Sequence, residues 1–167
     1  MAVKTLFKRT ALVLLAVIAV SGALIAVEYF GGQMMGLFSG SRPDGLGFRN
    51  GKFKPTSWKP NTVSSTIDKA DATHYIAPLA FSGDAAAAWA KFAALVKSQS
   101  RVRVVMEQPE YMHAEFKSAG LGFVDDVEFA LDAKAGVIHV RSASRLGVRD
   151  FDVNRKRIEH LRAQMKP

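Results

Sequence analysis

The sequence predicts an α+β domain, a four-stranded antiparallel meander sheet covered on one face by two helices and preceded by an N-terminal transmembrane helix. Three observations lead to it. An uncharged apolar run stands near the start of the chain, apolar and polar residues alternate across residues 101–144, and amphipathic stretches of helical period flank that region. The 167 residues allow one compact domain plus a terminal segment.

Residues 10–27 form an uncharged apolar run that would be about 27 Å long as a helix, close to the hydrocarbon thickness of a bilayer. Lys4, Lys8 and Arg9 precede the run, and Glu28 follows it. The positive-inside rule then predicts a single-pass protein of the bacterial inner membrane, with the N-terminus in the cytoplasm and the C-terminal domain in the periplasm. A cleaved signal peptide is the alternative, and it also exports the domain.

This interpretation divides the chain into four parts. Residues 1–9 are a basic cytoplasmic tail, residues 10–30 a transmembrane signal anchor, residues 31–60 a Gly/Pro-rich linker, and residues 61–167 the exported domain. The linker contains seven Gly and three Pro without a sustained period, so we expect little regular structure there.

The two helices are predicted from their caps and apolar stripes. The first covers residues 84–98, with Ser82 or Asp84 as the N-cap. The second begins near Asp152, with Asp150 or Asp152 as the cap and Asn154 at the centre of the apolar stripe. The first stripe is Ala85, Ala88, Trp89, Phe92, Leu95 and Val96, and the second is Ile158, Leu161 and Met165.

Turns near residues 108–110, 119–120 and 133–135 divide residues 101–144 into four strands. Placing the apolar residues on one face fixes which side chains point toward the helices. These are Val102, Val104, Met106, Met112, Ala114, Phe116, Phe123, Val127, Phe129, Leu131, Ile138 and Val140. The opposite face is expected to be exposed to water, and it carries Arg103, His113, Glu115, Lys117, Asp126, Glu128, His139 and Arg141.

Composition excludes several classes of site. The chain has no cysteine, which rules out disulfides and thiolate chemistry. The four histidines lack metal-ligand spacing, and no phosphate-binding glycine loop is present, so we expect no metal and no cofactor. The net charge of +8 is local, since Lys4, Lys8 and Arg9 contribute +3 and residues 141–167 contribute +5. An exported domain is not expected to bind nucleic acid.

Asp125 falls on the apolar face, beside Ala114 and Ser142, where an unpaired carboxylate would cost several kcal/mol. We therefore predict a buried polar network of Asp125, Ser142 and Asn154 that locks the C-terminal helix to the sheet. On the other face Asp126 is expected between His113 and Arg141. This predicted exposed ionic row is favoured over a catalytic His–Asp pair, because no nucleophile accompanies it.

The basic stretch after the last strand is the candidate binding site, for an anionic ligand or an envelope protein partner. The hypothesis is a non-enzymatic binding or scaffold module, with no catalytic residue assigned. The alternative is an envelope enzyme that uses Asp125, His113 or Glu115 as general acid or base. The candidate ligand-binding residues are Arg141, Ser142, Ser144, Arg145, Asn154, Arg155 and Arg157.

Five segments carry a resemblance to a known family. They are PNTVSS (60–65), YMHAEFKS (111–118), FVDDVEF (123–129), VIHVRSASRLG (137–147) and NRKRIEHLR (154–162), the last preceded by Asp150. With them the chain resembles the domain of unknown function 1499 family over residues 55–165. The resemblance implies no activity, because the family has none established. It places Thr56 and Thr62 where the family has a cysteine pair, so no thiol-based role is expected here.

Overall fold

The computed structural model describes residues 38–165, which fold into an α+β domain of six antiparallel strands and two helices. The predicted transmembrane helix of residues 10–27 lies outside the described residues. Within residues 38–165, no helix is both long and apolar enough to cross a membrane.

The four predicted strands form the meander that the alternation indicated. They are β3 (Val102–Gln108), β4 (Tyr111–Lys117), β5 (Val124–Asp132) and β6 (Val137–Ser144), and each pairs with the next. Two short strands, β1 (Thr62–Ser64) and β2 (Leu79–Ala80), were not predicted. Both pair with β6, β1 near its end and β2 near its start, so the sheet has six strands rather than four.

The pairing of β5 differs from the prediction by two residues. Glu128, rather than Asp126, lies between His113 and Arg141. Asp125 likewise lies between Phe116 and Ser144 rather than between Ala114 and Ser142. Because side chains alternate with a period of two, a two-residue displacement keeps each side chain on its predicted face.

Met106 is the one strand residue that leaves its predicted face. The pairing of β3 with β4 shifts between Val104 and Met106, so that Val104 is opposite Ala114 but Met106 is opposite His113. A bulge of this kind turns the following residues over. Met106 is consequently exposed rather than part of the core.

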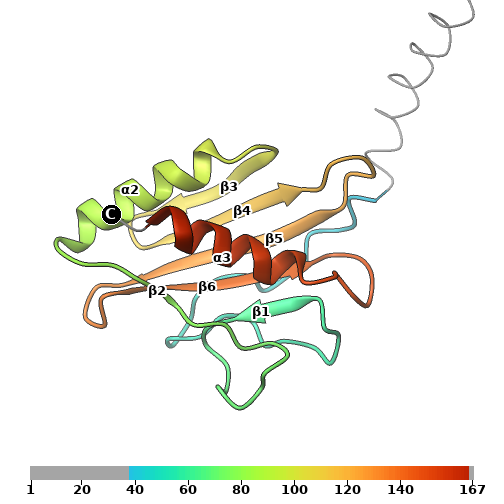
Figure 1. Ribbon diagram of the computed structural model, residues 1–167, viewed down its shortest axis with the longest axis horizontal. Helices are drawn as coiled ribbons and strands as arrows, with labels where there is room; N and C mark the ends of the chain where they lie inside the picture. The colour runs from blue at the N-terminus through green and yellow to red at the C-terminus, as the bar shows by residue number, and fades with distance from the viewer. Residues whose placement is uncertain (1–37, 166–167) are drawn as a thin grey trace, which may run out of the picture.

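Both helices cover the same face of the sheet, α2 (Ala85–Ser98) beside β3 and α3 (Val153–Met165) over β6 (Figure 1). Asp84 caps α2 by accepting a hydrogen bond from the N–H of Ala87 at 2.8 Å. The carboxylate of Asp150 accepts one from the N–H of Asn154 at 2.9 Å, at the start of α3. The predicted stripes face the sheet, and their members Trp89, Phe92, Val96, Ile158 and Leu161 are buried and complete an apolar core against Met112, Val127, Phe129 and Val140.

The second face of the sheet is not exposed, and that expectation was wrong. Residues 42–53, which the sequence placed in a linker, pack over it. Phe53 is buried and contacts the ring of Phe48, which stacks on His139 with centroids 5.6 Å apart. Residues 42–53 form no regular structure beyond a single β-bridge between Arg49 and Lys52. They nevertheless shield a row of polar side chains from water: His113, Glu115, Asp126, Glu128 and Arg141 are all buried.

Candidate functional site

The seven candidate ligand-binding residues divide among three places in the fold. Ser142, Ser144, Asn154 and Arg157 lie between the sheet and α3. Arg141 and Arg145 lie on the opposite face of the sheet, and Arg155 lines a pocket at the start of α3. The prediction of a single site is therefore corrected, because neighbouring residues of β6 and α3 point in different directions.

Between the sheet and α3, Arg157 is the centre of a buried polar network. Its guanidinium forms an ion pair with Asp125 and also donates to Ser142 Oγ at 2.9 Å and Asn154 Oδ1 at 2.6 Å. The side-chain amide of Asn154 in turn donates to Ser144 Oγ at 2.9 Å. The structure thus brings Asp125, Ser142 and Asn154 together around an arginine. Because the partners of Arg157 are all internal, this arginine is committed to joining α3 to the sheet.

On the second face, Arg145 joins two carboxylates. Its Nε and Nη2 donate to the two oxygens of Asp126, each at 2.8 Å, and Nη2 also donates to Glu115. His113 Nε2 lies 2.8 Å from Asp126 Oδ1. The predicted row of His113, Asp126 and Arg141 was expected in water, whereas these side chains are 4%, 1% and 6% exposed. Residues 42–53 cover them, which is the physical reason for the difference.

Glu128 is the centre of a second group of hydrogen bonds on the same face of the sheet. It is fully buried and accepts hydrogen bonds from Tyr111 Oη at 2.9 Å, Arg141 Nη1 at 3.1 Å and the backbone N–H of Gly47 at 2.6 Å. The last bond ties the covering segment to the sheet. Among the residues that the structure describes, the buried Nε–H group of Arg141 has no partner.

The electrostatics of Glu115 and Asp126 argue against their use in general acid or base chemistry. Burial alone would raise the pKa of Glu115, but hydrogen bonds from Arg42, Arg103 and Arg145 outweigh it and lower the pKa to about 2. For Asp126 burial is likewise outweighed by Arg145 and His113, and the pKa is also about 2. Both carboxylates stay ionised at neutral pH. A general acid or base works best with a pKa near the operating pH, and neither carboxylate meets that condition.

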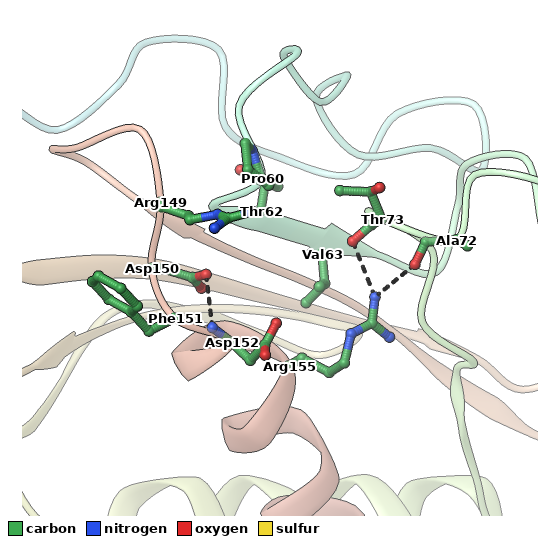
Figure 2. A pocket seen from close by; sticks show the side chains of 10 residues that line it. All are labelled: Pro60, Thr62, Val63, Ala72, Thr73, Arg149, Asp150, Phe151, Asp152 and Arg155. Atoms are coloured by element: carbon green, nitrogen blue, oxygen red, sulfur yellow. Dashed lines mark hydrogen bonds between the residues drawn. The ribbon is translucent and has the colours of Figure 1, made fainter.

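Arg155 lies in a pocket of about 430 Å³ between the segment before β1 and the first turn of α3 (Figure 2). Its guanidinium donates to the backbone carbonyls of Thr73 at 3.1 Å and Ala72 at 3.4 Å. Among residues 38–165, no carboxylate lies within ion-pair distance of it. The lining residues are Pro60, Thr62, Val63, Ala72, Thr73, Arg149, Asp150, Phe151, Asp152 and Arg155.

One wall of this pocket is built from a strained turn. Phe151 and Asp152 have positive φ values of 55° and 66°, in the left-handed region that bulky residues avoid. Phe151 is 80% exposed at the pocket rim. Asp150 holds the turn, because its carboxylate accepts from the backbone N–H of Asp152 at 3.1 Å and from both the backbone and the side chain of Asn154.

Of the residues that line this pocket, Arg155 alone is among the ligand-binding residues predicted from the sequence. Arg149 and Phe151 lie in the same loop, and the run VRDF after the glycine at 147 was the signal that could have found them. Thr62 and Thr73 come from distant segments and carried no such signal. Within residues 38–165, no group of three or more potential metal-ligating side chains is arranged to hold an ion.

Comparison with known proteins gives a family without an activity. No curated protein and no solved structure shows significant similarity to the chain. Residues 52–165 match the profile of a family described as "Protein of unknown function (DUF1499)". This match covers both faces of the sheet and the pocket, and the chain belongs to the DUF1499 family.

Proposed function

We propose that this protein is a membrane-anchored periplasmic binding module whose pocket at the start of α3 holds a small anionic ligand through Arg155 and Arg149. The observation that carries the proposal is the state of Arg155. Its guanidinium lines a pocket and donates to two backbone carbonyls through Nη2 alone. Its Nε and Nη1 have no partner among residues 38–165, so they are free to bind an anion.

The other arginines of the predicted site support this assignment by contrast. Arg145 and Arg157 each donate to buried carboxylates, Asp126 and Asp125. Removing either arginine from its carboxylate to bind a ligand would leave a buried charge unpaired, which costs several kcal/mol. Arg155 has no such commitment, and Arg149, on the same pocket, forms no ion pair within the described part of the chain.

The charge of the pocket limits the ligand. The carboxylate of Asp150 is already occupied by N–H groups at the start of α3. These bonds come from neutral groups and leave its charge in place, so the two guanidinium groups of the pocket face two carboxylates, those of Asp150 and Asp152, and the formal charges sum to zero. A pocket without net positive charge favours a ligand with a single negative charge over a polyanion. The exposed ring of Phe151 at the rim offers an apolar contact beside the charged group.

The anchoring part of the proposal rests on the sequence. The uncharged run of residues 10–27 is long enough to cross a bilayer, and the basic residues before it favour a cytoplasmic N-terminus. The domain would then face the periplasm at the inner membrane. We propose no catalytic role, because Glu115 and Asp126 are held ionised in ion pairs.

Native mass spectrometry of the full chain extracted from its own membranes tests this function, together with titration of the protein with inorganic phosphate in mildly acidic buffer, where most of the phosphate carries a single negative charge. Arg155→Gln is the informative variant. Arg162→Gln is its matched control, since Arg162 also donates to backbone carbonyls from α3 but lies outside this pocket. We expect a bound anion on the parent and on Arg162→Gln, and at least tenfold weaker binding to Arg155→Gln. Equal binding by all three proteins would overturn the assignment.

A further inference from the structure

Exposed apolar side chains concentrate in two loops of the domain. The loop between β4 and β5 carries Leu121 and Phe123, and the loop between β6 and α3 carries Leu146, Val148 and Phe151. We call residues 118–123 and 145–152 the tip loops. Large apolar side chains gathered in one exposed region are typical of surfaces that bind a partner or a membrane.

The two tip loops are neighbours at one end of the sheet. The backbone N–H of Arg145 donates to the carbonyl of Val124 at 3.2 Å, which joins the end of β6 to the start of β5. The first described residues run between the loops: the ring of Phe38 lies 5.1 Å from that of Phe123, and Gly40 lies directly against the side chain of Leu146. Figure 1 shows both loops at the end where the described chain begins.

This arrangement places the tip loops close to the predicted membrane span. Ten residues, 28–37, separate the apolar run of residues 10–27 from Phe38. Ten residues reach at most about 36 Å when fully extended. Since Phe38 and Gly40 contact the tip loops, a bilayer crossed by residues 10–27 lies within that reach of Phe123 and Leu146.

The charged residues are also distributed unevenly between the two ends of the sheet. Arg101 and Lys117 lie where β3 begins and β4 ends, at the end of the sheet that carries the tip loops, and Arg149 lies in the second tip loop with Asp150 and Asp152, which leaves this end with one net positive charge. The turns at the opposite end are acidic on balance, with Glu107, Glu110 and Asp132 against Lys134. A domain polarised in this way is attracted to anionic lipid headgroups by its basic end.

We propose that the tip loops insert into the surface of the bilayer in which the chain is anchored. The side chains of Leu121, Val148 and Phe151 would lie below the headgroups, while Arg101 and Lys117 meet the lipid phosphates. The inference rests on the anchor of the proposed function. The inference also goes beyond the proposed function. Because Phe151 lines the anion pocket as well, its insertion would place the mouth of that pocket at the membrane surface.

The absence of cysteine makes a direct test clean, since one introduced thiol is the only one in the chain. The full chain is labelled with an environment-sensitive fluorophore in the variants Val148→Cys and Ala133→Cys. Both positions are exposed in loops, but Ala133 lies in the turn between β5 and β6 at the far end of the sheet. Each protein is reconstituted in vesicles of phosphatidylethanolamine and phosphatidylglycerol with a lipid-borne nitroxide quencher, and aqueous iodide is used in a parallel series.

We expect the lipid-borne quencher to act several-fold more strongly at position 148 than at position 133, with the reverse order for iodide. Flotation of the chain with the vesicles, but equal quenching at the two positions, would overturn the insertion and leave the anchor in place. A chain that does not float would overturn both. The phosphate titration measures ligand binding to the pocket independently. A failure of ligand binding can therefore be distinguished from a failure of insertion or of anchoring.

Discussion

Arg145 and Asp126 form a doubly hydrogen-bonded ion pair beneath the segment that covers the second face of the sheet. Nε donates to Oδ2 and Nη2 to Oδ1, each at 2.8 Å, and both side chains are almost fully buried. Such a pair is not a strong source of net stability, because desolvation offsets most of the attraction. The stability of the domain therefore depends on both partners, because each buried charge is tolerated in the interior only while the other is present.

Arg145→Gln should therefore destabilise the domain by about 3–5 kcal/mol, because it leaves Asp126 and Glu115 as buried charges without their shared cation. Arg103→Gln is the matched control. Arg103 also pairs with Glu115, but its side chain is 69% exposed, so its removal should cost about 0–1 kcal/mol. Urea unfolding of the two variants checks this. Equal losses for the two variants would show that the burial of Arg145 does not matter.

The same network predicts a loss of stability in acid. The pKa values of Glu115 and Asp126 are about 2 in the folded protein, below the values of about 4.3 and 3.9 expected for unfolded Glu and Asp. The unfolded chain then binds protons first as the pH falls. The stabilisation is complete above about pH 5 and is lost progressively as the pH falls toward 2. The urea concentration at the midpoint of unfolding, measured from pH 6 to pH 2, should decrease across this pH range. The decrease should be less steep for Asp126→Asn than for the parent.

Asp125→Ala should destabilise the domain by about 2–4 kcal/mol, since it leaves the largely buried guanidinium of Arg157 without its carboxylate. Asp132→Ala, also on β5 but in a more exposed position, serves as the control and should cost only about 0.5–1 kcal/mol, because it removes one exposed hydrogen bond from the N–H of Ala135. Thermal unfolding followed by circular dichroism compares the two. An unchanged Tm for Asp125→Ala would show that this network does not stabilise the packing of α3 on the sheet.

The sequence predicted the meander, the starts of both helices and the face on which each strand residue lies, with the exception of Met106. These features follow from local periodicity and capping, which the sequence shows directly. The pairing of β5 did not follow, since alternation distinguishes the faces but not two alignments that differ by two residues. Strands as short as β1 and β2 carry too little pattern to be found.

The largest error concerned the second face, and its cause was the segment of residues 42–53. This segment has no period, so it was predicted to be part of a linker, and without a cover the polar face was expected in water. The signal that could have corrected this lay in composition. Phe48 and Phe53 are large apolar residues in a glycine-rich stretch, and both find partners on or near that face.

The covering role of this segment gives the last prediction. Phe53→Ala should destabilise the domain by about 3 kcal/mol, because the buried ring fills space that the surrounding side chains cannot close. Trp58→Ala is the control, since Trp58 is 75% exposed a few residues later and its loss should change stability by about 0.5 kcal/mol or less. Hydrogen exchange separates local from global effects. If residues 42–53 shield the ionic network, the N–H of Gly47, bonded to Glu128, exchanges faster in Phe53→Ala than in Trp58→Ala. Equal exchange at Gly47 in the two variants would mean that the ring of Phe53 does not hold the cover in place.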